Sequence, residues 1–95
     1  MIKIIEIKYK NNFIVLDRIN KVFVINKIKK EFDEKLFSNL LNTISLWKHE
    51  YINNEIIDGF SFIIDIYFDK TKERILIKNE FPSNFQEFLN IIGEL

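Results

Sequence analysis

The fold of this chain is decided by residues 58–78, which have the sequence DGFSFIIDIYFDKTKERILIK. Even-numbered positions from Phe60 to Phe68 are all apolar. Because side chains alternate between the two faces of a strand, one face of this segment is predicted to lie in the core. The polar residues 69–72 turn the chain, and residues 74–78 return as the partner strand. We therefore expect a long β-hairpin, introduced by an Asp58-Gly59 turn.

A short helix is predicted directly after this hairpin. Pro82 and Ser83 end the second strand, and Ser83 with Gln86 three residues later has the spacing of a capping box. The apolar side chains behind this cap would form one buried stripe, made of Phe85, Phe88, Leu89 and Ile92.

The first half of the chain predicts a meander followed by a longer helix. Residues 2–9, 13–16 and 22–25 are rich in apolar and β-branched side chains and are separated by polar turns, which favours three antiparallel strands. From residue 28 to 46 the apolar period changes to four, which is typical of a helix whose start is capped by Asn26 or Asp33. Residues 47–57 are predicted to be a loop. The expectation is one α+β domain over residues 1–95, with about five antiparallel strands and two helices in the order βββαββα.

Composition narrows the function classes. The 95 residues include 14 basic and 14 acidic side chains, so the basic excess of a nucleic-acid-binding protein is missing and a nucleic-acid partner is not expected. There is no cysteine, and no apolar run is long enough to span a bilayer, so we expect a soluble cytoplasmic protein without a membrane association. A single histidine, His49, cannot build a multi-histidine metal site. We expect no metal and no cofactor.

No set of residues predicts catalysis. Asp65 and Asp69 lie four residues apart on one strand face, roughly 13 Å at ~3.3 Å per residue, which exceeds the spacing of paired catalytic carboxylates. We interpret both as solvated. The sequence therefore favours a protein that is not an enzyme.

The strands contain more apolar residues than one core face requires. In 13–16, 22–25 and 75–77, both sets of alternating positions are apolar. Either the two helices cover opposite faces of the sheet, or one face is partly bare and meets a partner or a second copy. The simpler alternative is that an AT-rich coding sequence inflates isoleucine and phenylalanine at tolerant positions. The candidate partner contacts are Trp47, Tyr51, Ile63 and Tyr67.

One constellation resembles a known pattern. It comprises Trp47, Tyr51, Asp58, Gly59, Phe62, Asn79, Phe81, Pro82, Ser83, Asn84 and Phe85. It is similar to the pattern W…Y…DG…W followed by GxNxYPxNF in small bacterial proteins, which are similar to those of toxin–immunity and mobile-element neighbourhoods. The resemblance covers about residues 47–92. Phe62 stands where the pattern prefers Trp, and residues 77–78 where it prefers Gly.

These motif residues can be explained by structure as well as by ligand contact. Asp58-Gly59 suits a turn, and Pro82 restrains Phe81 to extended geometry. The asparagines can bond loop backbone. Phe81 and Phe85 would pack where the hairpin meets the helix, while Trp47 and Tyr51 would anchor the preceding loop there.

The resemblance and the apolar surplus together imply a non-catalytic protein-binding module. We expect an immunity-type or other inhibitory protein that sequesters a toxin or defence enzyme by steric occlusion. A phage or plasmid anti-defence inhibitor and a structural homo-oligomer without a separate target are the alternatives.

Overall fold

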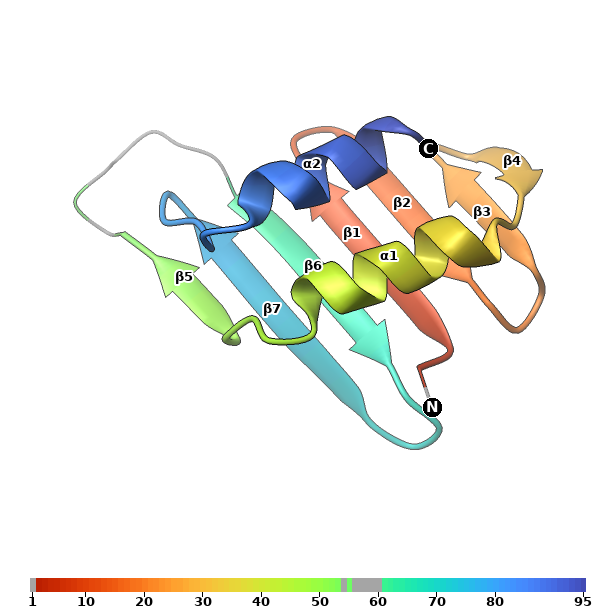
Figure 1. Ribbon diagram of the computed structural model, residues 1–95, viewed down its shortest axis with the longest axis horizontal. Helices are drawn as coiled ribbons and strands as arrows, with labels where there is room; N and C mark the ends of the chain where they lie inside the picture. The colour runs from red at the N-terminus through yellow and green to blue at the C-terminus, as the bar shows by residue number, and fades with distance from the viewer. Residues whose placement is uncertain (1, 54, 56–60) are drawn as a thin grey trace.

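A computed structural model describes residues 2–53, 55 and 61–95, and in this part of the chain it shows an α+β fold (Figure 1). The elements are β1 (Ile4–Tyr9), β2 (Asn12–Asp17), β3 (Val22–Ile25), β4 (Ile28–Glu31), α1 (Glu34–Ile44), β5 (Glu50–Ile52), β6 (Ser61–Tyr67), β7 (Lys72–Lys78) and α2 (Phe85–Gly93). The predicted α+β class is confirmed. The predicted turn at Asp58-Gly59 lies outside the described residues.

The strands form one mixed seven-stranded sheet in the order β4-β3-β2-β1-β6-β7-β5. The predicted meander is present as β1–β2–β3, and the predicted hairpin is present as β6–β7. The first strand pairs with β6 along its other edge, which joins the two hairpin units into one sheet. The expectation of about five antiparallel strands was too low by two strands, and the pairing of β5 with β7 is parallel.

The first additional strand, β4, occupies residues that were expected to be helical. Asn26 and Lys27 have φ angles of 51° and 72° and connect β3 to β4 in a two-residue turn. Positive φ at both central residues is the geometry of a type I′ hairpin turn, whose twist matches that of the strands. Ile28, the first member of the four-residue spacing, is 64% exposed, so its place in that spacing was coincidental.

The helix α1 therefore begins later than expected. Asp33 is its N-cap, and the Asp33 carboxylate accepts hydrogen bonds from the backbone N–H groups of Lys35 and Leu36. The later members of the apolar spacing do form the buried stripe, with Phe37, Leu40 and Ile44 at 3% exposure or less.

The second additional strand, β5, lies within the predicted loop. Its three residues pair in parallel with residues 76–78 of β7, and Leu76 N donates to His49 O at 2.8 Å. So short a strand has little local preference of its own, and the free edge of β7 supplies its hydrogen-bond partners.

The start of α2 also differs from the prediction. The N-cap is Asn84 and not Ser83, so the predicted capping box is wrong. The Asn84 side chain does not bond the first turn of its own helix, because its two polar atoms bind Trp47 and Thr43 instead.

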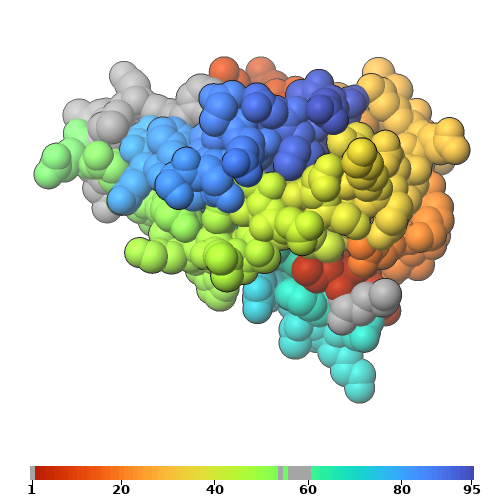
Figure 2. Space-filling view, in the orientation of Figure 1, coloured from red at the N-terminus to blue at the C-terminus, as the bar shows by residue number. Residues whose placement is uncertain are grey.

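Both helices cover the same face of the sheet (Figure 1). The atoms of α1 and α2 form one continuous layer on this side (Figure 2). Beneath them lie alternate residues of the strands, and the resulting core contains Ile5, Ile7, Ile14, Leu16, Phe23, Phe37, Leu40, Ile44, Phe62, Ile64, Ile66, Ile75, Ile77, Phe88 and Ile92. Of the two arrangements that the apolar surplus allowed, the structure has the one with a single covered face.

The β3–β4 turn gives a test of the added strand. Lys27→Gly should raise the free energy of unfolding by about 0.5–1 kcal/mol, because relief of a left-handed backbone worth about 1–2 kcal/mol exceeds the entropic cost of glycine. Lys29→Gly, which removes the same charge from within β4, should lower it by a similar amount. Urea unfolding measures both. A lower free energy of unfolding for Lys27→Gly would contradict the turn geometry.

Candidate functional site

The face of the sheet turned away from the helices is the candidate site, and we call it the open face. Its apolar side chains alternate with the buried ones and comprise Ile4, Phe13, Val15, Val22, Val24, Ile52, Ile63, Tyr67 and Leu76. Phe13 is 43% exposed and the others are half-buried. Val15 pairs directly with Val24, so the β2–β3 half of this face is apolar.

A network of charges occupies the centre of the open face. Register places Asp65 of β6 between Glu6 of β1 and Arg74 of β7. Arg74 Nε donates to Asp65 Oδ1 at 2.7 Å and Arg74 Nη2 donates to Oδ2 at 3.1 Å, which is a bidentate pair. Lys72 Nζ lies 3.8 Å from Asp65 Oδ2, and Tyr67 OH donates to Glu6 Oε1 at 2.8 Å. The face therefore has a fixed pattern of charge beside its apolar half.

Asp65 is only 2% exposed although it lies on the uncovered side of the sheet. Burial by itself raises the pKa of this carboxyl, but the hydrogen bond and charge of Arg74, together with Lys72 and Lys8, outweigh it and hold the pKa below its ordinary value of 3.8. The interpretation of Asp65 as solvated was therefore wrong. Asp69 is exposed, as expected, and pairs with Lys3 at 3.1 Å.

The network also affects Tyr67. Its hydrogen bond to Glu6 raises the pKa of the phenol above 10.0, with burial and the Glu6 charge adding to the effect. At neutral pH the open face thus presents an ionised Asp65, a cationic Arg74 and a neutral Tyr67. This arrangement suits recognition by charge and shape, because each of these groups has a fixed partner.

The four predicted contact residues do not share a surface. Ile63 and Tyr67 lie on the open face, opposite the buried residues of β6. Tyr51 pairs with Ile77, which is buried on the helix side, and Trp47 contacts Tyr51 there with ring centroids 6.3 Å apart. A single aromatic-rich face built from all four residues is therefore excluded.

Trp47 and Asn84 connect the two helices. Trp47 Nε1 donates to Asn84 Oδ1 at 2.6 Å, and Asn84 Nδ2 donates to Thr43 O near the end of α1 at 2.9 Å. One asparagine thus joins the C-terminal end of α1, the following segment and the start of α2. Asn84 was expected to bond loop backbone, but its backbone partner, Thr43, lies in the last turn of α1.

The motif phenylalanines pack around this junction. Phe81 and Phe85 have ring centroids 4.8 Å apart, and Phe85 is 6.2 Å from Trp47. Phe62 is fully buried, 4.7 Å from Tyr9 in a stacked arrangement and 5.2 Å from Phe85. The predicted packing of Phe81 and Phe85 at the hairpin–helix junction is present.

The remaining described motif residues shape the backbone. Asn79 has a φ of 63° and bridges to Ile52, which ends the pairing of β7. Pro82 is buried and Ser83 is exposed. Tyr51 OH accepts a hydrogen bond from Lys48 N at 2.9 Å, which closes a small turn before β5.

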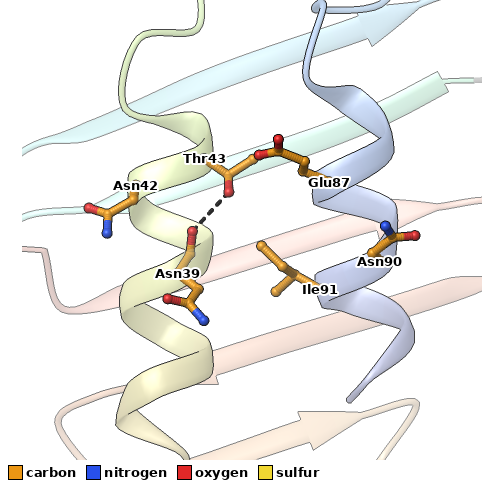
Figure 3. Close-up of a pocket in the computed structure, with 6 residues that line it drawn as sticks. All are labelled: Asn39, Asn42, Thr43, Glu87, Asn90 and Ile91. Atoms are coloured by element: carbon orange, nitrogen blue, oxygen red, sulfur yellow. Dashed lines mark hydrogen bonds between the residues drawn. The ribbon is translucent and has the colours of Figure 1, made fainter.

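A polar groove of about 410 Å³ lies between the helices (Figure 3). Thr43 donates its hydroxyl to Asn39 O at 2.9 Å, Glu87 reaches toward Thr43, and Asn42 points away from α2. These side chains do not converge on one point. Across residues 2–53, 55 and 61–95, no group of three or more His, Cys, Asp or Glu side chains could hold a metal ion.

Sequence reasoning missed the Asp65–Arg74 pair, although a signal for it was present. Once Tyr67 pairs with Lys72 around the turn, moving two residues away from the turn on each strand places Asp65 opposite Arg74. The role of Asn84 as a link between Trp47 and Thr43 had no such signal, because those contacts span 37 and 41 residues of sequence.

Comparison of the chain with models of known families, with curated proteins and with solved structures found no match. Within the part of the chain that the structure describes, none of the helices is long and apolar enough to cross a membrane.

The Asp65–Arg74 pair predicts a pH dependence of stability. A carboxyl whose folded pKa is depressed stabilises the fold above its unfolded pKa, and this contribution is lost as pH falls through the folded value. Asp65→Asn should lower the free energy of unfolding at pH 7 by about 1–2 kcal/mol and flatten its decline below about pH 5. Asp69→Asn should have a clearly smaller effect, because its pair with Lys3 is exposed and screened by solvent. Equal effects of the two variants in urea titrations would contradict this assignment.

The junction predicts a second stability effect. Asn84→Ala should destabilise the fold by about 1–3 kcal/mol, because it leaves Trp47 Nε1 and Thr43 O without their partner. Asn90→Ala, an exposed asparagine of α2 bonded to Gln86, should change stability by about 0.5 kcal/mol or less. Thermal unfolding measures both, and Trp47 emission should shift to longer wavelength in Asn84→Ala alone.

Proposed function

We propose that this chain is a non-catalytic protein-binding module and that the open face is its binding surface. The observation that supports the proposal is the placement of both helices on one side of the sheet, which leaves the apolar β2–β3 half uncovered on the other (Figure 1). Antiparallel sheets with one solvated face usually carry polar residues there. The open face has Phe13, Val15, Val22 and Val24 in that position instead.

The charge network supports the same proposal. Contacts between apolar side chains supply most of the binding free energy of an interface, whereas fixed charges select the partner and speed the encounter. Asp65, Arg74 and Glu6 are held in position by pairing within the face, so little ordering would be needed on binding. A partner would bury the β2–β3 half and match the charges beside it.

The class of partner that we favour is a toxin or a defence enzyme. In this proposal the chain is an immunity-type or other inhibitory protein of the cytoplasm that blocks its target by steric occlusion. It rests on the resemblance of residues 47–92 to small bacterial proteins, and a phage or plasmid anti-defence inhibitor would use the same surface. A structural homo-oligomer is the second candidate, since an uncovered apolar face can also be closed by a twofold mate.

Substitutions on the open face test the proposal. Phe13→Asp should reduce recovery of the bound protein at least about tenfold, because a partly exposed aromatic anchor becomes a charge without affecting the buried layer. Ile19→Asp is the matched control, since Ile19 is a 57% exposed apolar residue in the β2–β3 turn. The measurement is affinity capture from the native host with mass spectrometry, alongside light scattering of the purified chain.

Light scattering distinguishes the two candidates. A dimer that dissociates in Phe13→Asp and not in Ile19→Asp would favour the homo-oligomer. Binding through the open face would be refuted if the chain is a monomer and both Phe13→Asp and Ile19→Asp recover the same proteins as the unaltered chain.

A further inference from the structure

A second surface feature lies on the helix side, away from the open face, and we call it the aromatic pocket. It has a volume of about 420 Å³, and its walls include Leu46, Trp47, Tyr51, Glu80, Phe81 and Pro82. Leu46 is 94% exposed and Phe81 is 45% exposed. Two of the large apolar residues that the fold leaves in solvent therefore meet at one pocket, and such clustering is typical of a binding site.

The walls of the aromatic pocket are held in place by hydrogen bonds and ring contacts. Asn84 fixes the Trp47 indole through the 2.6 Å hydrogen bond, and Phe85 supports both Phe81 and Trp47. Tyr51 is positioned by the bond from Lys48 N to its hydroxyl oxygen. A ligand entering this pocket would meet aromatic surfaces whose positions are already set, so little conformational entropy would be lost on binding.

The charge of the pocket selects the ligand. Among the lining residues that the structure describes, Glu80 is the only charged one, and it forms no ion pair or hydrogen bond with another described residue. Lys78, two residues earlier, alternates with the buried Ile77 and lies on the open-face side. A carboxylate beside aromatic rings attracts a cation, because ring faces carry negative charge and the carboxylate adds a full one.

We propose that the aromatic pocket binds an arginine or lysine side chain of a polypeptide partner. The methylene stem would pack on Leu46 and Phe81, and the cationic head would meet Glu80 and the rings of Trp47 and Tyr51. This site is on the other side of the sheet from the open face and does not depend on the function proposed for that face. It gives Trp47 and Tyr51 a binding role in addition to their structural one.

The single tryptophan of the chain lines this pocket and serves as the reporter. The probes are acetyl-Gly-Arg-Gly-amide and its citrulline counterpart, which has nearly the same shape and no charge. The arginine peptide should change Trp47 emission saturably in the millimolar range and bind about five- to tenfold more tightly than the citrulline peptide. The indole N–H resonance of Trp47 should move with the same titration midpoint.

Two variants separate charge recognition from structural damage. Glu80→Gln should reduce the affinity for the arginine peptide to that for the citrulline peptide, and it should leave unfolding unchanged because Glu80 is exposed. Glu87→Gln removes an exposed carboxylate of α2 that is not part of this pocket, and it should bind like the unaltered chain. Equal binding of both peptides, or no saturable change with the arginine peptide, would overturn the proposal.

Discussion

The one-sided packing of α1 and α2 on the sheet is the constraint on which the rest of this structure depends. Strand residues such as Ile7, Ile64 and Phe62 alternate toward the helices and are fully buried, and Phe37 and Phe88 complete the layer above them. Their alternate neighbours must then point the other way, where none of the described elements covers them. The open face is thus a direct consequence of how the core is built, since a strand cannot bury one side without presenting the other.

The open face keeps a charged group in a buried position. Asp65 lies on β6 between β1 and β7, where neighbours on both sides leave little room for water, and it is stabilised there by a bidentate arginine. An unpaired carboxylate in the same place would be costly. The pair therefore stabilises the fold and gives the centre of the face a defined charge pattern, while the β2–β3 half beside it stays apolar.

The junction around Trp47 and Asn84 connects most of the described motif residues to the fold. Asn84 joins Thr43 of α1 to the start of α2, and Phe62 and Phe85 fill the space between the hairpin and the helix. These contacts explain most of the described motif residues as structural. The same supports leave one side of Trp47 and Phe81 at the surface beside Glu80, so an anchoring cluster also forms the wall of a pocket.

Elements whose partners are near in the chain can be predicted from local sequence. The β1–β2–β3 meander, the β6–β7 hairpin and the buried stripe of α1 follow from alternation, turns and helical spacing. Strand β5 depends on tertiary contacts, because it requires the free edge of β7, and no periodicity encodes which side of the sheet the helices cover. The burial of Asp65 and the link through Asn84 also depend on contacts between segments that are distant in sequence. The turn at Asn26 and Lys27 lies between these cases, because its positive φ angles become favourable only when β4 can pair with β3. Short-range patterns fix hydrogen bonds between neighbours, whereas contacts across the sheet depend on which faces remain to be buried.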